Sequence, residues 1–209
     1  MNPLIFAPLF LLALALLAVF SVRRNKALLA SIAETGGLSF EWHGWNAPWT
    51  MERELDRGTL RVEMTQRPSA GVGRKPFTTV SFTLTPRVAL PEGVGMLQSS
   101  RLLTMMRELV DPTVLDLPMD YEAVAGASIG LEAESLEVAD PGALKAWLDA
   151  REGRRDAMNQ VVVAGSHGAA LYSLVTPTEI RHEIRDNSPR AMVYLTLISS
   201  LEDLAATLD

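Results

Sequence analysis

The run from Leu4 to Val22 contains no charged side chain and a single hydroxyl, that of Ser21. An α-helix of this length covers about 28 Å, which is close to the thickness of the hydrocarbon core of a bilayer. Such a helix would leave no polar side chain stranded in lipid except one hydroxyl at its end. The sequence therefore predicts a transmembrane helix in its first tenth.

The charges that flank this run predict its orientation. Arg23, Arg24 and Lys26 follow it directly, whereas only the α-amine is positive before it. By the positive-inside rule, the N-terminus lies outside and the remainder of the chain is cytoplasmic. A cleaved signal peptide is the alternative, but it needs a basic segment before the apolar run and a small-x-small site after it, and neither is present. We expect an uncleaved anchor over 1–22, a helical connector over 23–37 and a soluble domain over 38–209.

Composition limits the chemistry that the domain can perform. The chain has no cysteine, which excludes disulfides, thiolate nucleophiles and cysteine-ligated metals. Residues 23–101 carry eleven basic and seven acidic side chains, whereas residues 102–209 carry eight and eighteen. Either this asymmetry places a basic part next to an anionic leaflet, or it has no role. The acidic second half argues against nucleic acid as a partner, because phosphate binding needs a concentrated basic surface.

Alternating and β-branched segments indicate a sheet. Strands are predicted over 38–43, 50–55, 59–65, 77–88, 129–138, 161–163, 169–176 and 179–185, with a hairpin around Asp56-Arg57-Gly58. Helical spacing predicts helices over 99–110, from the Asp140-Pro141 start to Met158, and from Ser188-Pro189 to the C-terminal end. The fold class is thus α+β: an N-terminal transmembrane helix followed by one mainly antiparallel-sheet domain with about three helices.

One short motif resembles a catalytic signature. Gly126-Ala-Ser128-Ile-Gly130 has the G-x-S-x-G spacing of a serine hydrolase turn, and Asp140 and His167 follow it in the order of a triad, with His182 and Asp186 as substitutes. The context argues against it, since no buried strand precedes Ser128 and the residues after it alternate like a strand. A plain turn is the other interpretation.

Further polar clusters point to binding rather than to catalysis. His43, His167 and His182 are too far apart in sequence for a local metal motif, and no cofactor motif is present. Gly71 to Lys75 offers backbone amides beside Arg74 and Lys75, which suits an anionic headgroup or an acidic partner, or is a solvated hairpin loop. The acids Glu132, Glu134 and Glu137 fit a solvated face of a strand.

Three of the four tryptophans, Trp42, Trp45 and Trp49, lie close together in sequence. They form either part of the core or an anchor for a partner or for lipid headgroups. With the predicted anchor, the sequence favours a non-catalytic accessory or scaffold subunit of a membrane protein complex, with the bilayer and other subunits as partners. The alternatives are a module that binds anionic lipid and, less favoured, a serine hydrolase using Ser128.

Overall fold

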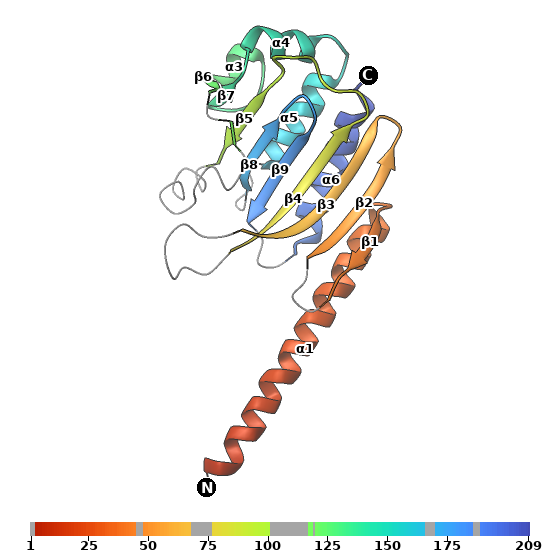
Figure 1. Cartoon of the computed structure of the whole chain (residues 1–209), viewed down its shortest axis with the longest axis vertical. Helices are drawn as coiled ribbons and strands as arrows, with labels where there is room; N and C mark the ends of the chain where they lie inside the picture. The colour runs from red at the N-terminus through yellow and green to blue at the C-terminus, as the bar shows by residue number, and fades with distance from the viewer. Residues whose placement is uncertain are drawn as a thin grey trace.

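The computed structural model describes residues 3–44, 48–67, 77–100, 117–118, 120–165, 170–185 and 189–209, with the side chains of all but 3–9, 13 and 165. Within these residues the chain is α+β, with one large antiparallel sheet (Figure 1). The predicted α+β class with a mainly antiparallel sheet is confirmed, although the described part already contains five helices where about three were expected. The helices are α1 (Pro3–Thr35), α3 (Gly126–Ile129), α4 (Pro141–Asp149), α5 (Arg154–Gly165) and α6 (Ala191–Ala206).

A single sheet of nine strands runs through the domain in the order β1-β2-β3-β4-β9-β8-β5-β7-β6, and every pairing is antiparallel. The strands are β1 (Ser39–Trp42), β2 (Trp49–Leu55), β3 (Gly58–Arg67), β4 (Phe77–Pro86), β5 (Met96–Ser99), β6 (Glu122–Val124), β7 (Leu136–Val138), β8 (Ala170–Val175) and β9 (Ile180–Arg185).

Helix α1 has two parts with different surroundings. Its last turns pack on the domain, where Leu29, Ile32 and Ala33 are buried, and it ends at Gly36-Gly37 as predicted, with Gly37 at a φ of 63°. Its N-terminal part projects away from the domain (Figure 1). There the described large apolar side chains are between 47% and 65% exposed, namely Phe10, Leu11, Leu12, Leu14, Leu16, Leu17 and Phe20.

Within the described part of the chain, no helix combines the length and the apolar character needed to cross a membrane. The transmembrane part of the predicted fold is therefore not supported by the structure.

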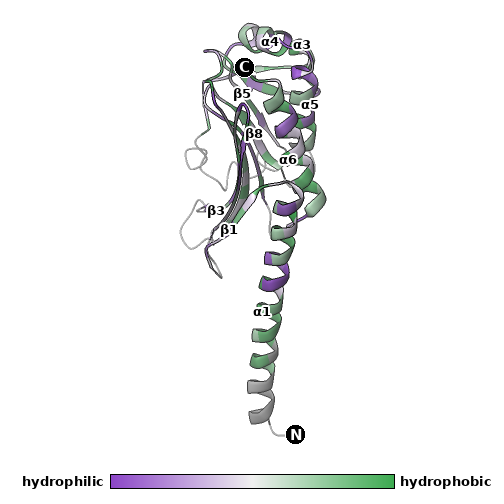
Figure 2. Cartoon of the chain, turned by 90° about the vertical axis from the view of Figure 1, so that its right-hand side faces the viewer, coloured by the Kyte–Doolittle hydropathy of each residue, from purple (hydrophilic) through white to green (hydrophobic). Residues whose placement is uncertain are grey.

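The core lies between the sheet and a layer of helices on one of its faces (Figure 2). Helix α6 contributes Tyr194, Ile198 and Leu201, which are buried against the centre of the sheet, and the ring of Phe82 on β4 meets Tyr194 edge-on with the ring centroids 5.2 Å apart. The last turns of α1 lie in the same layer, beside α6 and β1. The connector predicted over 23–37 is thus partly built into the domain.

Most strands predicted in the two outer thirds of the chain are confirmed. The Asp56-Arg57 turn joins β2 to β3, with Leu55 paired to Gly58, as the hairpin signal indicates. The strands β1, β4, β8 and β9 also form where alternation and β-branched content predicted them. In this part of the sheet the local pattern and the tertiary environment agree.

The middle of the chain differs from the predictions. The strand expected over 129–138 is wrong in its first half, because Gly126–Ile129 forms the short helix α3 and only Leu136–Val138 is a strand. Gly126 explains this turn, since a Cβ there would lie 2.3 Å from the carbonyl oxygen of Ala133. Gly130, with a φ of 77°, then ends α3. The strands β5 and β6 were not predicted.

The helix predicted from Asp140 to Met158 is two helices. Asp140 is the N-cap of α4 as expected, and its carboxylate accepts hydrogen bonds from the backbone N–H groups of Gly142 and Ala143 at 2.8 and 3.0 Å. The chain then turns at Gly153, whose φ is 78°, and α5 begins. The strand predicted over 161–163 is wrong because these valines belong to α5, with two of them buried against the core and Val163 partly exposed.

The turn between α4 and α5 is fixed by a buried arginine. Arg154 is 1% exposed, stacks on the Trp147 ring at 4.9 Å, and donates hydrogen bonds to the carbonyl oxygens of Trp147 and Thr207. Burial lowers the pKa of Arg154, and the charge of Asp209 partly offsets this effect. The residue thereby joins both helices to the C-terminal end of the chain. The helix predicted over 99–110 lies outside the described residues from 101 onward, and Ser99 itself ends β5.

Candidate functional site

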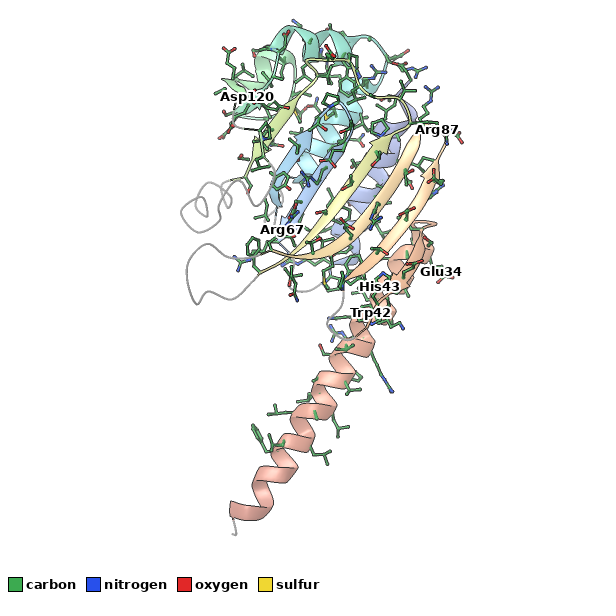
Figure 3. All side chains as sticks on the ribbon, in the orientation of Figure 1. Glu34, Trp42, His43, Arg67, Arg87 and Asp120 are labelled. Atoms are coloured by element: carbon green, nitrogen blue, oxygen red, sulfur yellow. The ribbon has the colours of Figure 1, made fainter. Side chains whose placement is uncertain are left out.

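The end of the sheet from which α1 projects brings together residues that are far apart in sequence. Because all pairings are antiparallel, three strands end here and three begin here. Figure 3 shows Trp42, His43 and Arg67 at this end, and Arg87 at the opposite end. We call this end of the domain the base; its strand ends are Trp42, Trp49, Arg67, Phe77, Ala170 and Arg185.

The two described tryptophans of the predicted cluster have different environments. Trp49 is 3% exposed and lies in the core, with its ring centroid 6.2 Å from that of Tyr194. Trp42 is only partly buried, and the Nζ atom of Lys26 on α1 lies 6.0 Å from the centroid of its ring. Trp45 lies outside the described residues. Of the described pair, Trp42 is the one with surface that a partner could contact.

Those predicted basic residues that the structure describes lie on the same side of the molecule as the base. Arg23, Arg24 and Lys26 are exposed on α1, between its projecting part and the turns that pack on the domain. Arg74 and Lys75 lie outside the described residues; the nearest described residues on either side, Arg67 and Phe77, are strand ends at the base.

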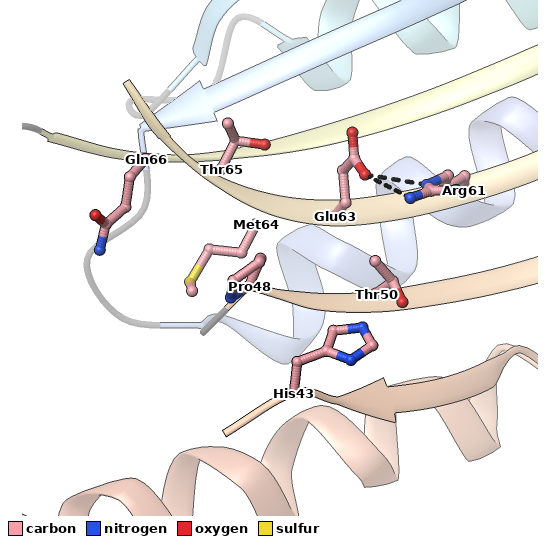
Figure 4. Close-up of a pocket in the computed structure, with 8 residues that line it drawn as sticks. All are labelled: His43, Pro48, Thr50, Arg61, Glu63, Met64, Thr65 and Gln66. Atoms are coloured by element: carbon pink, nitrogen blue, oxygen red, sulfur yellow. Dashed lines mark hydrogen bonds and ion pairs between the residues drawn. The ribbon is translucent and has the colours of Figure 1, made fainter. Parts of the chain in front are cut away.

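A pocket of about 440 Å³ opens on the sheet near the base (Figure 4). Its two charged residues are already paired, because Arg61 donates to Glu63 at 2.9 Å and lies 3.6 Å from Glu52. The pocket therefore offers no unpaired cation to an anionic ligand. Its lining consists of His43, Pro48, Thr50, Arg61, Glu63, Met64, Thr65 and Gln66.

A buried carboxylate lies close to the base, on the sheet face that points away from the helices. Glu183 has no exposed surface, and Arg67 binds it through two hydrogen bonds of 3.0 and 3.1 Å. Its Oε2 atom also accepts hydrogen bonds from the hydroxyls of Tyr172 at 2.5 Å and Ser81 at 3.3 Å. These four residues join β3, β4, β8 and β9, which makes the network a clamp across the centre of the sheet.

The electrostatics of this network exclude proton transfer near neutral pH. Burial raises the pKa of the Glu183 carboxyl, but the hydrogen bonds from Arg67 and Tyr172 and the charge of Arg67 outweigh burial, and the net pKa is lowered. Burial and the adjacent Glu183 charge both raise the pKa of the Tyr172 phenol. Glu183 thus stays ionised and Tyr172 stays protonated, which favours a structural role.

On the helix-facing side of the sheet, His182 is completely buried beside Ser173. The Oγ atom of Ser173 lies 2.8 Å from Nδ1 of His182, and Nε2 has no hydrogen-bond partner among the described residues. Burial lowers the pKa of His182 to about 4, and the nearby Glu183 charge opposes this shift without offsetting it. Because Ser173 is only 3% exposed, a substrate cannot reach this pair in the folded domain.

The titration of His182 predicts a pH dependence of stability. The unfolded chain takes up a proton on this histidine near pH 6.5, whereas the folded chain does so only near pH 4. The free energy of unfolding should therefore fall as pH is lowered through this window, by up to about 3 kcal/mol. Urea denaturation at a series of pH values measures this slope. A His182→Leu variant should lose that part of the slope, and an unchanged slope would contradict the assignment.

The structure does not assemble the predicted hydrolase triad from its described members. Ser128 lies on the surface in α3, and its hydroxyl donates to the carbonyl oxygen of Ala125 at 2.7 Å. Asp140 caps α4, and His182 is buried in the sheet with Ser173 as its partner. His167 and Asp186 lie outside the described residues. Each described candidate thus has its own local role.

Comparison with known proteins gives no relative. No protein-family model, no curated protein and no solved structure matches this chain. Among the residues that the structure describes, no three acidic or histidine side chains are grouped closely enough to bind a metal ion. The features that point to a function are therefore α1, the base and the charges around them.

Some of the residues predicted from the sequence as contacts lie at this candidate site. Trp42 and the cations after the apolar run were predicted as contacts, and the structure places Trp42 and Lys26 side by side. The Arg67–Glu183 clamp was not predicted, because its members are far apart in the chain. The only local signal was the strand Ile180–Arg185, where a charged face alternates with an apolar one that His182 interrupts.

Proposed function

We propose that this protein is a single-pass, membrane-anchored accessory or scaffold subunit of a membrane protein complex, which acts by binding and catalyses no reaction. The main observation that supports this proposal is the projecting part of α1, which holds exposed leucine and phenylalanine side chains away from the domain. Exposed apolar surface of this extent needs a partner, because contact of such side chains with water is unfavourable. An uncharged run that is long enough for a bilayer core makes lipid the proposed partner of this part.

The orientation of the chain follows from the cations beyond the apolar run. Arg23, Arg24 and Lys26 favour the cytoplasmic side, so the domain is proposed to be cytoplasmic and the N-terminus to lie outside. Anchoring confines the domain to partners at or in the same membrane. Other membrane protein subunits are the class of partner that this arrangement favours.

The environments of the polar residues support a binding role. Ser128, Asp140 and His182 each have a local structural partner, and the Glu183 network is inaccessible to a substrate. The surface that remains for a partner at the base includes the exposed part of Trp42. Tryptophan is often a dominant contact in protein interfaces because it buries a large apolar area and retains a polar N–H group.

Purification of the full chain in mild detergent, from cells that naturally contain it, tests this proposal. We expect the chain to elute with other membrane proteins in a fixed ratio, and Trp42→Ala to weaken that association about tenfold or more, the range of an interface hot spot. Val88→Ala, which alters an exposed apolar residue near the opposite end of the sheet, is the matched control and should have no effect. A wild-type chain that elutes as a lone monomer would contradict the proposal.

A further inference from the structure

The continuity of α1 limits how far the base can lie from a membrane that holds the apolar run. Leu29, the first buried residue among the described side chains of α1, is seven positions after Val22, which corresponds to about 10 Å along the helix. Lys26, which lies over Trp42 at the base, is only four positions after Val22, or about 6 Å. The headgroup layer on each side of a bilayer is about 5–8 Å thick. With residues 4–22 in the bilayer, the base therefore lies at the level of the headgroups.

The helix layer presents an exposed apolar residue at the base. Helix α6 follows the end of β9, so its first turn lies at the base, and there Met192 is 81% exposed beside the exposed Arg190. Val163, near the end of α5 and before the first residue of β8, is 36% exposed. An apolar side chain next to a cation suits a membrane interface, where the first can enter the acyl boundary and the second can pair with phosphate.

The cations at the base differ from those at the opposite end in their pairing. Two arginines away from the base are tied to acids, Arg53 to Glu202 at 2.8 Å and Arg154 to Asp209 at 3.4 Å. By contrast, Arg23, Arg24 and Arg190 form no ion pair with any described residue. Their charge is available to an external anion.

Acidic side chains at the base do not cancel this charge. Among the described residues at the base, Glu183 is buried and bound by Arg67, and the exposed Glu41 offsets only one of these cations. The described surface of the base is therefore net positive, whereas the whole chain has a net charge of −6.

We propose that the base binds anionic phospholipid headgroups, with Arg190 and Met192 as contacts from the domain and Arg23 and Arg24 as contacts from α1. This inference rests on the proposed function, because α1 brings the base to the membrane. The bilayer is then a second binding partner of the folded domain. Its contact with the base orients the domain so that the opposite end of the sheet faces away from the membrane. Each arginine near an anionic surface favours the docked orientation by about fivefold.

The absence of native cysteine permits a direct test with the full chain. A Met192→Cys variant that carries an environment-sensitive fluorophore is placed in nanodiscs of phosphatidylcholine, with or without phosphatidylglycerol. We expect a blue-shifted emission in the anionic nanodiscs, and its loss at high salt. Val88→Cys, labelled in the same way, should give the same emission in both lipids.

Two substitutions, measured in the same nanodiscs, test whether Arg190 contacts the anionic headgroups. Arg190→Gln should reduce the ratio of docked to undocked domain about fivefold, whereas Arg87→Gln, at the other end of the sheet, should leave it unchanged. A Met192 probe whose emission is independent of lipid charge overturns this inference while the anchor stands. A chain that enters neither kind of nanodisc overturns the anchor and this inference together.

Discussion

Replacing Arg67 by Met should lower the free energy of unfolding by about 3–5 kcal/mol, because it leaves the buried Glu183 carboxylate without its cation. The loss should depend on pH in a defined sense. In the wild type the pKa of Glu183 is lowered by folding. The ionised carboxylate therefore contributes to the free energy of unfolding at pH values above its pKa in the unfolded chain, and this contribution is lost as pH falls through its pKa in the folded chain. Without Arg67 the burial effect dominates and raises the pKa of Glu183, and the deficit should shrink as acid protonates the carboxyl.

Arg61→Met is the matched control for this prediction. Arg61 lies on the same strand and the same sheet face, and it also pairs with a carboxylate, but that pair is exposed and is expected to contribute less than about 1 kcal/mol. Urea denaturation followed by tryptophan fluorescence measures both variants. Arg67→Met/Glu183→Leu should recover part of the loss, because it removes the unpaired charge. Equal effects of the two arginine substitutions would contradict the clamp.

The double variant Leu14→Arg/Leu17→Arg should release the chain from membranes. Both leucines are exposed on the projecting part of α1, at 47% and 64%. Two arginines near the centre of a bilayer cost about 5–7 kcal/mol on an insertion scale, which removes most of the preference of the helix for lipid. The fraction of protein that resists alkaline extraction from the membrane pellet measures this effect.

The same variant leaves the folded domain intact, which separates anchoring from stability. Neither leucine contacts the core, so thermal unfolding of the domain should match that of the wild type. Leu14→Ala/Leu17→Ala, which shortens both side chains without adding charge, should remain largely in the pellet. A double-arginine variant that resists extraction as fully as the wild type would show that lipid does not hold this part of α1.

The sequence predicts best the elements that local patterns specify. The Asp56-Arg57 turn, the Asp140 cap and the Gly36-Gly37 helix end are all determined by residues within a few positions of one another, and all three are confirmed. The valines at 161–163 show the opposite case. Their β-branched side chains favour a strand in isolation, but α5 buries Val161 and Val162 against the core, and tertiary packing outweighs the local preference.

The remaining features depend on contacts between distant residues. β6 spans three residues, which is too short for an alternating pattern, and its place at the sheet edge depends on pairing with β7, which in turn pairs with β5. The Arg67–Glu183 clamp and the base likewise arise only when the nine strands are ordered. The local spacing offered Ser128 as a less favoured catalytic candidate beside a plain turn, and its hydroxyl donates to the carbonyl oxygen of Ala125, three residues earlier.

Accessibility of single cysteines in cells tests the anchor most directly, because the native chain contains none. Three variants, Asn2→Cys, Leu14→Cys and Thr85→Cys, are treated with a membrane-impermeant maleimide before and after permeabilisation. We predict that Asn2→Cys reacts in intact cells, that Thr85→Cys reacts only after permeabilisation, and that Leu14→Cys reacts in neither state. Reaction of Leu14→Cys as readily as Thr85→Cys would contradict the proposal that α1 holds this domain at a membrane.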